Sequence, residues 1–248
     1  MLFGWFRIDI IAEYWPLFLR GLGATIELTI ISIIAGTSLG LLLGLGKIAL
    51  VEKGFWKWPV KVFVRWPSNL YVTFFRGTPL FVQILLIHFA LIPLLIHQDS
   101  GLLISGDTAL YLKREYGAFI SGSLALSLNA AAYIAEIFRA GIQSIDRGQF
   151  EASRSSGLNY FQMMRYVIVP QAIRRMLPPL GNEAITLLKD SSLVSAIGLG
   201  ELAYAARTAA GAYARYWEPY LFISAIYLIL TMVLSSGVSF LEKKYKSS

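Results

Sequence analysis

Long apolar stretches alternate with shorter polar segments along this chain. Residues 28–46, 78–96 and 219–241 contain no Asp, Glu, Lys or Arg. A helix needs about 20 predominantly apolar residues to cross the hydrocarbon layer of a bilayer. We therefore predict an all-α membrane protein with five transmembrane helices. The five predicted crossings cover roughly residues 22–46, 70–96, 117–135, 176–188 and 219–241.

Two of these spans contain residues that interrupt a helix. Pro79 lacks a backbone N–H and Gly77 is conformationally permissive, so the second span should break between them. Pro178 and Pro179 should kink the fourth span in the same way. Residues 191–200 are apolar but too few to cross a bilayer, and they predict a re-entrant segment.

Small residues on the first span predict close helix packing. Gly36, Gly40 and Gly44 recur at every fourth position, which places them on one helix face. Such a face lets a second helix approach closely.

The segments outside the spans divide into membrane-surface and aqueous parts. Residues 1–20 mix aromatic and aliphatic side chains with Arg7, Asp9 and Glu13, which predicts an amphipathic helix lying in the membrane interface. Residues 98–116 are polar and are expected to form an external loop, and residues 201–218 are also expected to be external.

The charge distribution favours a membrane surface over nucleic acid as the partner of this basic chain. The chain is 56% hydrophobic and 15% charged, with a net charge of +7. The basic residues cluster at the ends of apolar spans, as the positive-inside rule places them. Basic segments at 47–65, with Trp56, Trp58 and Trp66, and at 146–175 are therefore assigned to the cytoplasm. With five crossings, the N-terminus lies outside and the C-terminus inside.

The residue inventory excludes several kinds of chemistry. Cysteine is absent, so disulfides and thiolate metal sites are excluded, and His88 and His97 are the only histidines. Gly46 and Lys47 lack the neighbours that a phosphate-binding loop requires. The expected position of His88 in the middle of a span favours a hydrogen bond within the bundle. We expect no catalytic residues, no metal and no cofactor in this chain.

The polar segment 146–170 between the third and fourth spans is more structured than a simple connection requires. Residues 149–156 predict a short helix that Gly157 stops, and Asn159 is a good cap for a second helix. Glu151 projects from the first turn of the short helix. Small residues around Glu151 leave a low surface that fits into a cleft on another protein; the alternative is a solvated linker.

Several motifs in fixed order resemble one known family. Glu151-Ala152-Ser153, Gly157 and Val167-Ile168-Val169-Pro170 look like the Glu-Ala-Ala loop of ABC importer permease subunits, closest to those for polar amino acids. Ser153 stands where that family usually has a second Ala. The resemblance extends through the segments 75–80, 132–141 and 187–193 and covers nearly everything after residue 20.

The resemblance implies a type I ABC importer permease fold, with residues 1–248 as a single permease domain in a bacterial inner membrane. It implies that a cytoplasmic ATP-binding cassette subunit, present in two copies, hydrolyses ATP with Mg²⁺. A second permease subunit, identical or related, and an external solute-binding protein are the other implied partners. The residues implied to couple this chain to the ATPase are Gln149, Glu151, Ala152, Ser153, Ser156 and Gly157.

Charged residues at membrane depth are candidates for substrate binding. Each such charge costs at least about 2.5 kcal/mol on insertion scales, so it should face a partner or a cavity. Arg76 and the pair Lys189 and Asp190 lie beside the predicted helix breaks, where transporters bind substrates. A zwitterionic amino acid fits this set. The candidate substrate-binding residues are Arg76, Gly77, Thr78, Gln83, Asn129, Lys189, Asp190, Ser191 and Ser192.

Structural roles remain open for the same residues. Arg76 is also expected to pair with Asp190 or Glu183, which would hold the broken helices together. Gln83 and Asn129 suit hydrogen bonds between helices equally well. Glu136 and Arg139, three residues apart on one helix face, are interpreted as a lock at the inner side of the membrane.

Two other classes of function compete with the importer. An ion-coupled secondary transporter or channel for amino acids would explain the intramembrane charges but not the structured loop 146–170. A membrane enzyme would need a nucleophile with a histidine and a carboxylate, or a set of metal ligands, and the spans suggest neither.

Overall fold

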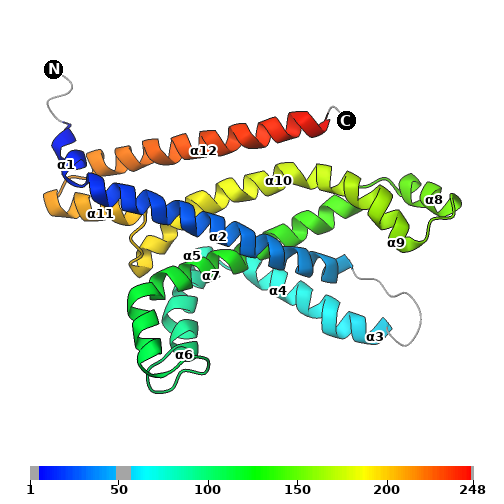
Figure 1. Ribbon diagram of the computed structural model, residues 1–248, viewed down its shortest axis with the longest axis horizontal. Helices are drawn as coiled ribbons and strands as arrows, with labels where there is room; N and C mark the ends of the chain where they lie inside the picture. The colour runs from blue at the N-terminus through cyan, green and yellow to red at the C-terminus, as the bar shows by residue number, and fades with distance from the viewer. Residues whose placement is uncertain (1–5, 49–56, 247–248) are drawn as a thin grey trace. The chain divides into compact units, whose positions relative to one another are not determined.

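The computed structural model describes residues 6–48 and 57–246, and within these ranges its regular structure is helical (Figure 1). Apart from helices there is one isolated parallel bridge, between Ile96 and Ile104. The described residues form two compact units, each made of three chain segments. The first unit takes its residues from Met1–Ile34, Thr78–Leu128 and Ile185–Val233, and the second from Ala35–Gly77, Asn129–Ala184 and Leu234–Ser248.

Three helices of the described chain are long and apolar enough to cross a membrane. They are α2 (Trp15–Ile48), α7 (Gly106–Gln143) and α12 (Trp217–Lys246). Each contains one of the predicted crossings and extends beyond it at both ends.

A fourth span is present if the helices on either side of residue 78 count as one broken crossing. The predicted interruption of the second span is confirmed: α4 (Trp66–Gly77) ends one residue before Thr78, and α5 (Leu80–Leu86) begins after Pro79. Pro79 has ψ 133°, an extended conformation that no α-helix contains. The second half of the span continues through the π-helix η2 (Ile87–Leu91) into α6 (Ile92–Leu95).

The basic segment before this span is described only in part. Lys53 and Trp56 lie outside the described residues. From Lys57 the chain forms α3 (Lys57–Val60) and the π-helix η1 (Lys61–Arg65), which lead directly into α4.

The segment 160–197 is helical throughout but more polar than the three long spans. It comprises α9 (Tyr160–Met163), the π-helix η3 (Met164–Ile168), α10 (Val169–Asp190) and the 3-10 helix η4 (Ser191–Ile197). Pro178 and Pro179 lie inside α10. α10 is not among the helices apolar enough to span a bilayer by itself, so the fourth crossing stays a prediction.

Two segments that were expected to be external contain helices. The long helix α7 begins at Gly106, inside the predicted loop 98–116, and Ala109 on its first turns is 1% exposed. Within 201–218 the chain forms α11 (Leu202–Tyr213). Alanine has the highest helix propensity, and Ala205, Ala206 and Ala209 are fully buried on one face of α11, so packing stabilises this helix.

The N-terminal segment packs into the first unit. The predicted interfacial helix 1–20 falls partly outside the described residues; from residue 8 onward it consists of α1 (Ile8–Glu13) and the start of α2. Ile10 and Ile11 are 0% and 8% exposed and join a hydrophobic cluster with Phe18 and Ile223. Protein packing therefore buries Ile10 and Ile11, whereas Ile8, Trp15 and Leu19 are 69%, 47% and 50% exposed.

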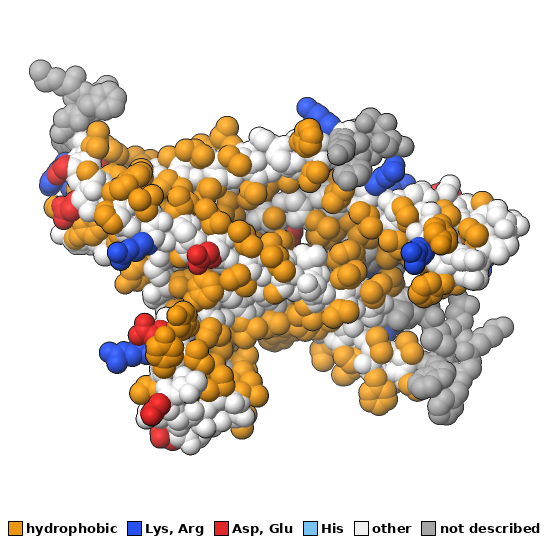
Figure 2. Space-filling model, in the orientation of Figure 1, with side chains coloured by type: hydrophobic (Ala, Val, Ile, Leu, Met, Phe, Trp, Pro, Cys, Tyr) orange, Lys and Arg blue, Asp and Glu red, His pale blue; other side chains and the backbone are white. Residues whose placement is uncertain are grey.

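Large apolar side chains are exposed along the long helices. Figure 2 shows them covering much of the visible face. On α12, Leu228, Ile229 and Val233 are 60%, 61% and 65% exposed. Soluble proteins rarely expose apolar surface over such an extent, whereas the side of a helix that faces lipid must be apolar. The surface composition agrees with the membrane interpretation of the sequence.

Close packing at glycine confirms part of the predicted glycine face and leads to a test. In the second unit, a Cβ added at Gly40 would lie 2.8 Å from the Ile134 side chain and 2.9 Å from the Ala131 carbonyl oxygen.

We expect Gly40→Val to destabilise the packing of α2 on α7 by about 1–3 kcal/mol, because the backbones of the two helices must move apart. A lower unfolding midpoint in detergent would confirm this. Gly23→Val, at a position with nothing within 4 Å, is the matched control.

Candidate functional site

The loop 146–170 forms a capped helix followed by a turn and a second cap. The helix α8 (Arg147–Ser155) starts two residues earlier than predicted, because the Asp146 carboxylate accepts a hydrogen bond from the Gly148 N–H at 2.7 Å. Gly157 has φ +78° and ends the helix, as predicted. Asn159 and Gln162 form a capping box at the start of α9.

One of the residues predicted to lie on the exposed surface of α8 is buried. Gln149, Glu151, Ala152 and Ser156 are exposed, together with Gly157. Ser153 is only 6% exposed, and its hydroxyl donates to the Gln149 carbonyl at 2.6 Å. Ser153 therefore lies on the inner face of α8, where its size matters for packing and not for an outside contact.

α8 is held to the rest of the second unit by apolar and polar contacts. Ile145, Met163, Ile168 and Met176 form a buried cluster, against which Phe150 of α8 packs. The Gln171 side chain on α10 donates to the Gln149 side chain at 3.2 Å. Packed side chains and this hydrogen bond therefore connect α8 to α9 and α10.

A four-residue cluster around Glu136 lies in the second unit. The Glu136 carboxylate on α7 bonds to Lys47 of α2 and to Arg139, whose Nη2 lies 2.7 Å away. Arg76 Nη1 of α4 lies 3.9 Å from the same carboxylate and its guanidinium lies over the ring of Tyr133. The Glu136 side chain is 17% exposed, and its single negative charge is shared among three cations, of which Arg76 and Arg139 are 44% and 34% exposed.

This cluster bears on two expectations from the sequence. The predicted pair of Glu136 with Arg139 is present, and within the second unit Arg76 has Glu136 as an ion-pair partner. Lys47 was missed, because it lies 89 residues from Glu136 and no local spacing links them.

Two candidate side-chain amides bond to backbone near the break in the second span. The Gln83 amide donates to the Thr78 hydroxyl at 2.8 Å and to its carbonyl at 3.1 Å, in the first unit. In the second unit, the Asn129 amide donates to the Phe75 carbonyl at 3.2 Å. Both side chains are nearly buried, at 3% and 7% exposed. These bonds favour the structural alternative, in which the amides satisfy carbonyls that the break leaves open.

The other candidate residues lie at the junction of α10 and η4 in the first unit. Lys189 is exposed and Asp190 is half-buried, and neither belongs to an ion pair within 4.0 Å in the described chain. Ser191 is fully buried and donates to the Leu188 carbonyl at 2.7 Å, whereas the Ser192 hydroxyl donates to the Lys189 carbonyl.

Part of the candidate set is brought together within the first unit. η4 packs against α5, the helix that begins just after Thr78 and Pro79. A Cβ at Gly122 of α7 would meet Val194 of η4 at 2.4 Å, so η4 also lies tightly against α7. Gln83 is therefore on an element that contacts η4, which Ser191 begins, and Thr78 lies two residues before that element. Arg76, Gly77 and Asn129 belong to the second unit.

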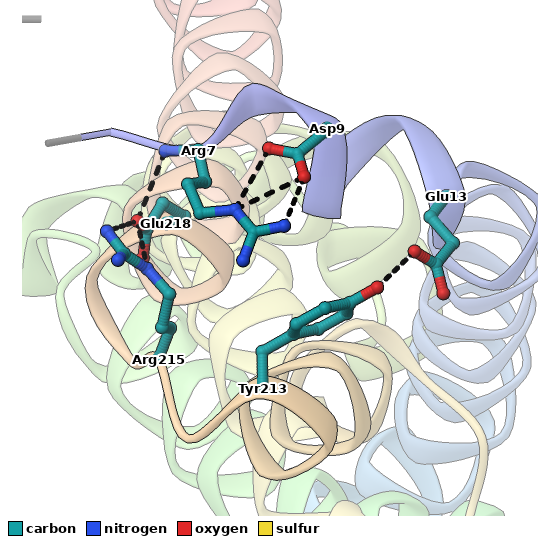
Figure 3. A network of polar contacts seen from close by, with 6 residues as sticks. All are labelled: Arg7, Asp9, Glu13, Tyr213, Arg215 and Glu218. Carbon is teal, nitrogen blue, oxygen red and sulfur yellow. Dashed lines mark hydrogen bonds and ion pairs between the residues drawn. The ribbon is translucent and has the colours of Figure 1, made fainter. Parts of the chain in front are cut away.

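A separate polar network fastens α1 in the first unit (Figure 3). The Glu218 carboxylate accepts bonds from the Arg7 backbone N–H at 3.2 Å and from Arg215 Nε at 2.7 Å. The hydrogen bond from the Arg7 guanidinium lowers the pKa of Asp9, and the bond to the Glu13 carboxylate raises the pKa of Tyr213. Sequence spacing could not reveal this network, since Glu13 and Tyr213 lie 200 residues apart.

His88 in the first unit makes the hydrogen bond expected from its position. Its Nδ1 lies 2.9 Å from the Ser121 hydroxyl. Ser121 donates its own proton to the Gly117 carbonyl at 2.6 Å, so His88 Nδ1–H is the donor. The described residues contain no group of three or more His, Asp or Glu able to hold a metal ion.

The chain is similar to known membrane transport components over nearly its whole length. Residues 59–247 match the family model described as "binding-protein-dependent transport system inner membrane component". The arginine transport system permease protein ArtQ of Bacillus subtilis (strain 168) is 36% identical over 94% of this chain and 94% of its own length. The probable amino-acid ABC transporter permease protein YckA of the same strain is 34% identical over 97% and 94%.

A solved structure is similar to the fold described above. A chain in the crystal structure of an amino acid ABC transporter with histidines is 37% identical, with a TM-score of 0.77, and the match covers 96% of this chain and 98% of that one. The match to the family model extends from α3 through α12. It includes the helix break at residues 78–79 and the α8 loop. The chain therefore belongs to the family of inner membrane components of binding-protein-dependent transport systems.

Proposed function

We propose that this chain is the transmembrane subunit of an ATP-driven importer that moves a polar amino acid, or a related derivative, into the cell. Family membership supports the role in transport, and the names of the relatives support the substrate class. The observation that carries the proposal is the contact between α5, which begins after the helix break at Thr78 and Pro79, and η4, which follows α10 directly at Ser191. Interrupted helices leave backbone N–H and C=O groups for a charged substrate.

The substrate contacts follow from the charges beside these interruptions. Lys189 and freed N–H groups at the start of η4 would meet the carboxylate of an amino acid, with the hydroxyl groups of Ser191 and Ser192 nearby. Asp190 and the carbonyl groups around Gly77 and Thr78 would accept its ammonium group. Arg76 is the least direct candidate, because its guanidinium already lies 3.9 Å from the Glu136 carboxylate.

A partner subunit would supply the energy by hydrolysing ATP, and α8 would be the part of this chain that the partner binds. Two copies of an ATP-binding cassette subunit would hydrolyse ATP with Mg²⁺ and bind the exposed face of α8 around Glu151. An external solute-binding protein would deliver the amino acid, and a second permease subunit, identical or related, would complete the pore. α10 would supply the fourth of the five crossings, so that the N-terminus lies outside and the C-terminus lies in the cytoplasm.

Transport in proteoliposomes tests this function against the ion-coupled alternative. The chain is reconstituted with its ATPase, second permease and solute-binding partners, and uptake of radiolabelled L-arginine and L-glutamine is measured. We expect uptake only when the ATPase subunit is present and ATP is supplied on the side of the membrane where that subunit lies. Uptake driven by a sodium or proton gradient without the ATPase subunit would reject the importer.

The role of Asp190 has its own test in the same assay. Asp190→Asn removes the negative charge that would meet the substrate ammonium, and a hydrogen bond to a charged group contributes about 1.5–3 kcal/mol. We expect the transport KM to rise about tenfold or more, with unchanged association with the ATPase. Asp107→Asn, on the exposed first turn of α7, is the control. A KM equal to that of the wild type would remove Asp190 from the substrate site.

A further inference from the structure

The loop that joins α6 to α7 is closed by backbone hydrogen bonds (Figure 1). It covers residues 96–105 and belongs to the first unit. The Leu102 N–H donates to the Leu94 carbonyl at 3.1 Å, and the Leu103 N–H donates to the Leu95 carbonyl at 2.9 Å. The outgoing side of the loop is thereby bonded to the end of α6.

The turn inside this loop admits only glycine. A Cβ added at Gly101 would lie 2.0 Å from the Ile104 carbonyl oxygen and 2.6 Å from the His97 nitrogen. The Gly106 N–H donates to the Gln98 carbonyl at 2.8 Å, which bonds the two ends of the loop to each other. A loop that is already ordered in this way loses little conformational entropy when a partner binds it.

Two neighbouring leucines of the loop are exposed. Leu102 and Leu103 are 69% and 74% exposed, more than any other leucine among the described residues. Asp99, Ser100 and Ser105, which flank them along the loop, are exposed as well. An exposed apolar patch with a polar rim is typical of a surface that binds another protein.

Lipid does not account for the exposure of these leucines, because the loop lies beyond the part of α7 that crosses the membrane. The predicted crossing begins at residue 117. At about 1.5 Å of rise per residue, residues 106–116 extend α7 by roughly 16 Å before that point. Lys113, Arg114 and Glu115 are exposed on this extension, and charged side chains are costly in hydrocarbon. Leu102 and Leu103 therefore lie on the aqueous side.

The position of this loop in the chain determines on which side of the membrane it lies. α7 is one candidate span, and it separates loop 96–105 from α8 along the chain. If α8 binds the ATPase in the cytoplasm, loop 96–105 lies on the external side. Transport in this family depends on a binding protein. A soluble partner that delivers the substrate from outside needs a surface on that side.

We propose that loop 96–105 is a docking site for the solute-binding protein, and that Leu102 and Leu103 enter an apolar pocket on that protein. This inference rests on the proposed function, since α8 defines the cytoplasmic side. A basic rim around the pocket would complement the carboxylate of Asp99. Such a rim charge affects the association rate and its salt dependence more than the affinity.

The test measures binding to the complete complex of permease and ATPase subunits in lipid nanodiscs. The probe is the solute-binding protein that supports uptake by the wild type, loaded with L-arginine or L-glutamine. For Leu102→Asp combined with Leu103→Asp, we expect the Kd to rise about tenfold or more, because two charges replace the central apolar contact. The concentration of binding protein that gives half-maximal uptake should rise by the same factor. Leu102→Met combined with Leu103→Met keeps the apolar surface, and its Kd should stay within about twofold.

A wild-type Kd in the aspartate variant would overturn the docking site and leave the loop to another contact, such as one with the second permease subunit. If the aspartate variant does not assemble, Leu103→Ser decides: a Kd raised about fivefold supports the inference, and an unchanged Kd rejects it. Failure of the wild type to import either amino acid overturns the proposed function itself. Normal import by the wild type with an unchanged Kd in the variants overturns the docking site alone.

Discussion

Glu151→Lys is expected to abolish most ATP-driven uptake while the protein remains inserted and its ATPase partners still hydrolyse ATP. Glu151 is exposed on α8, which is capped on both sides and packed against α9 and α10. Placing a positive charge where an interface expects a negative one costs several kcal/mol. We expect uptake to fall at least about tenfold, since each 1.4 kcal/mol lost in the interface changes the equilibrium by that factor.

The measurement compares uptake and ATP hydrolysis in the same proteoliposomes. Glu115→Lys makes the same charge change at an exposed site on α7, far along the chain from α8, and should leave both activities intact. Normal coupling in Glu151→Lys would show that the exposed face of α8 does not contact the ATPase, whatever the fold of the loop.

Glu136→Gln is expected to lower the stability of the second unit more than the loss of any one of its cationic partners. The substitution removes the only carboxylate among Lys47, Arg76 and Arg139, and the side chains of Lys47 and Glu136 are 11% and 17% exposed. Breaking a buried ion pair from one side costs about 3–5 kcal/mol, and partial exposure here reduces this to about 2–3 kcal/mol. A midpoint of thermal unfolding lower by about 5–10 °C corresponds to this change.

A double mutant separates the ion cluster from simple packing. If unpaired positive charge causes the loss, Lys47→Met combined with Glu136→Gln should be more stable than Glu136→Gln alone, because one of the repelling cations is removed. Arg139→Gln, at a side chain that is 34% exposed, should cost less than half as much. Equal stability of Glu136→Gln and wild type in detergent would show that the cluster contributes nothing to the fold.

Local signals in the sequence predicted the parts of the structure that depend on local interactions. The break between Gly77 and Pro79 follows from the covalent geometry of proline, and the end of α8 at Gly157 from the need for a positive φ. The cap at Asn159 was predicted because its side chain bonds to backbone three residues away. The three uninterrupted spans were predicted because lipid requires long apolar helices.

Interactions between distant segments could not be predicted from one sequence. The pairing of Lys47 with Glu136 and the burial of Glu201 depend on which helices become neighbours, and residue spacing contains no such information. The helix α11 was not predicted, because the alanines that stabilise it pack against residues of α1, α2 and α12 that lie far away in the sequence. Ser153 was assigned to the wrong face of α8, since a nine-residue helix offers few apolar positions to orient it.

The caps of α8 have a consequence for protein engineering. Asp146 opens this helix and Gly157 closes it, so its ends do not depend on residues elsewhere in the chain. A segment with this property can be exchanged as a unit between related transporters. If α8 binds the ATPase as proposed, transplanting residues 146–157 into a related permease should change which ATPase subunit that protein binds and leave its substrate unchanged.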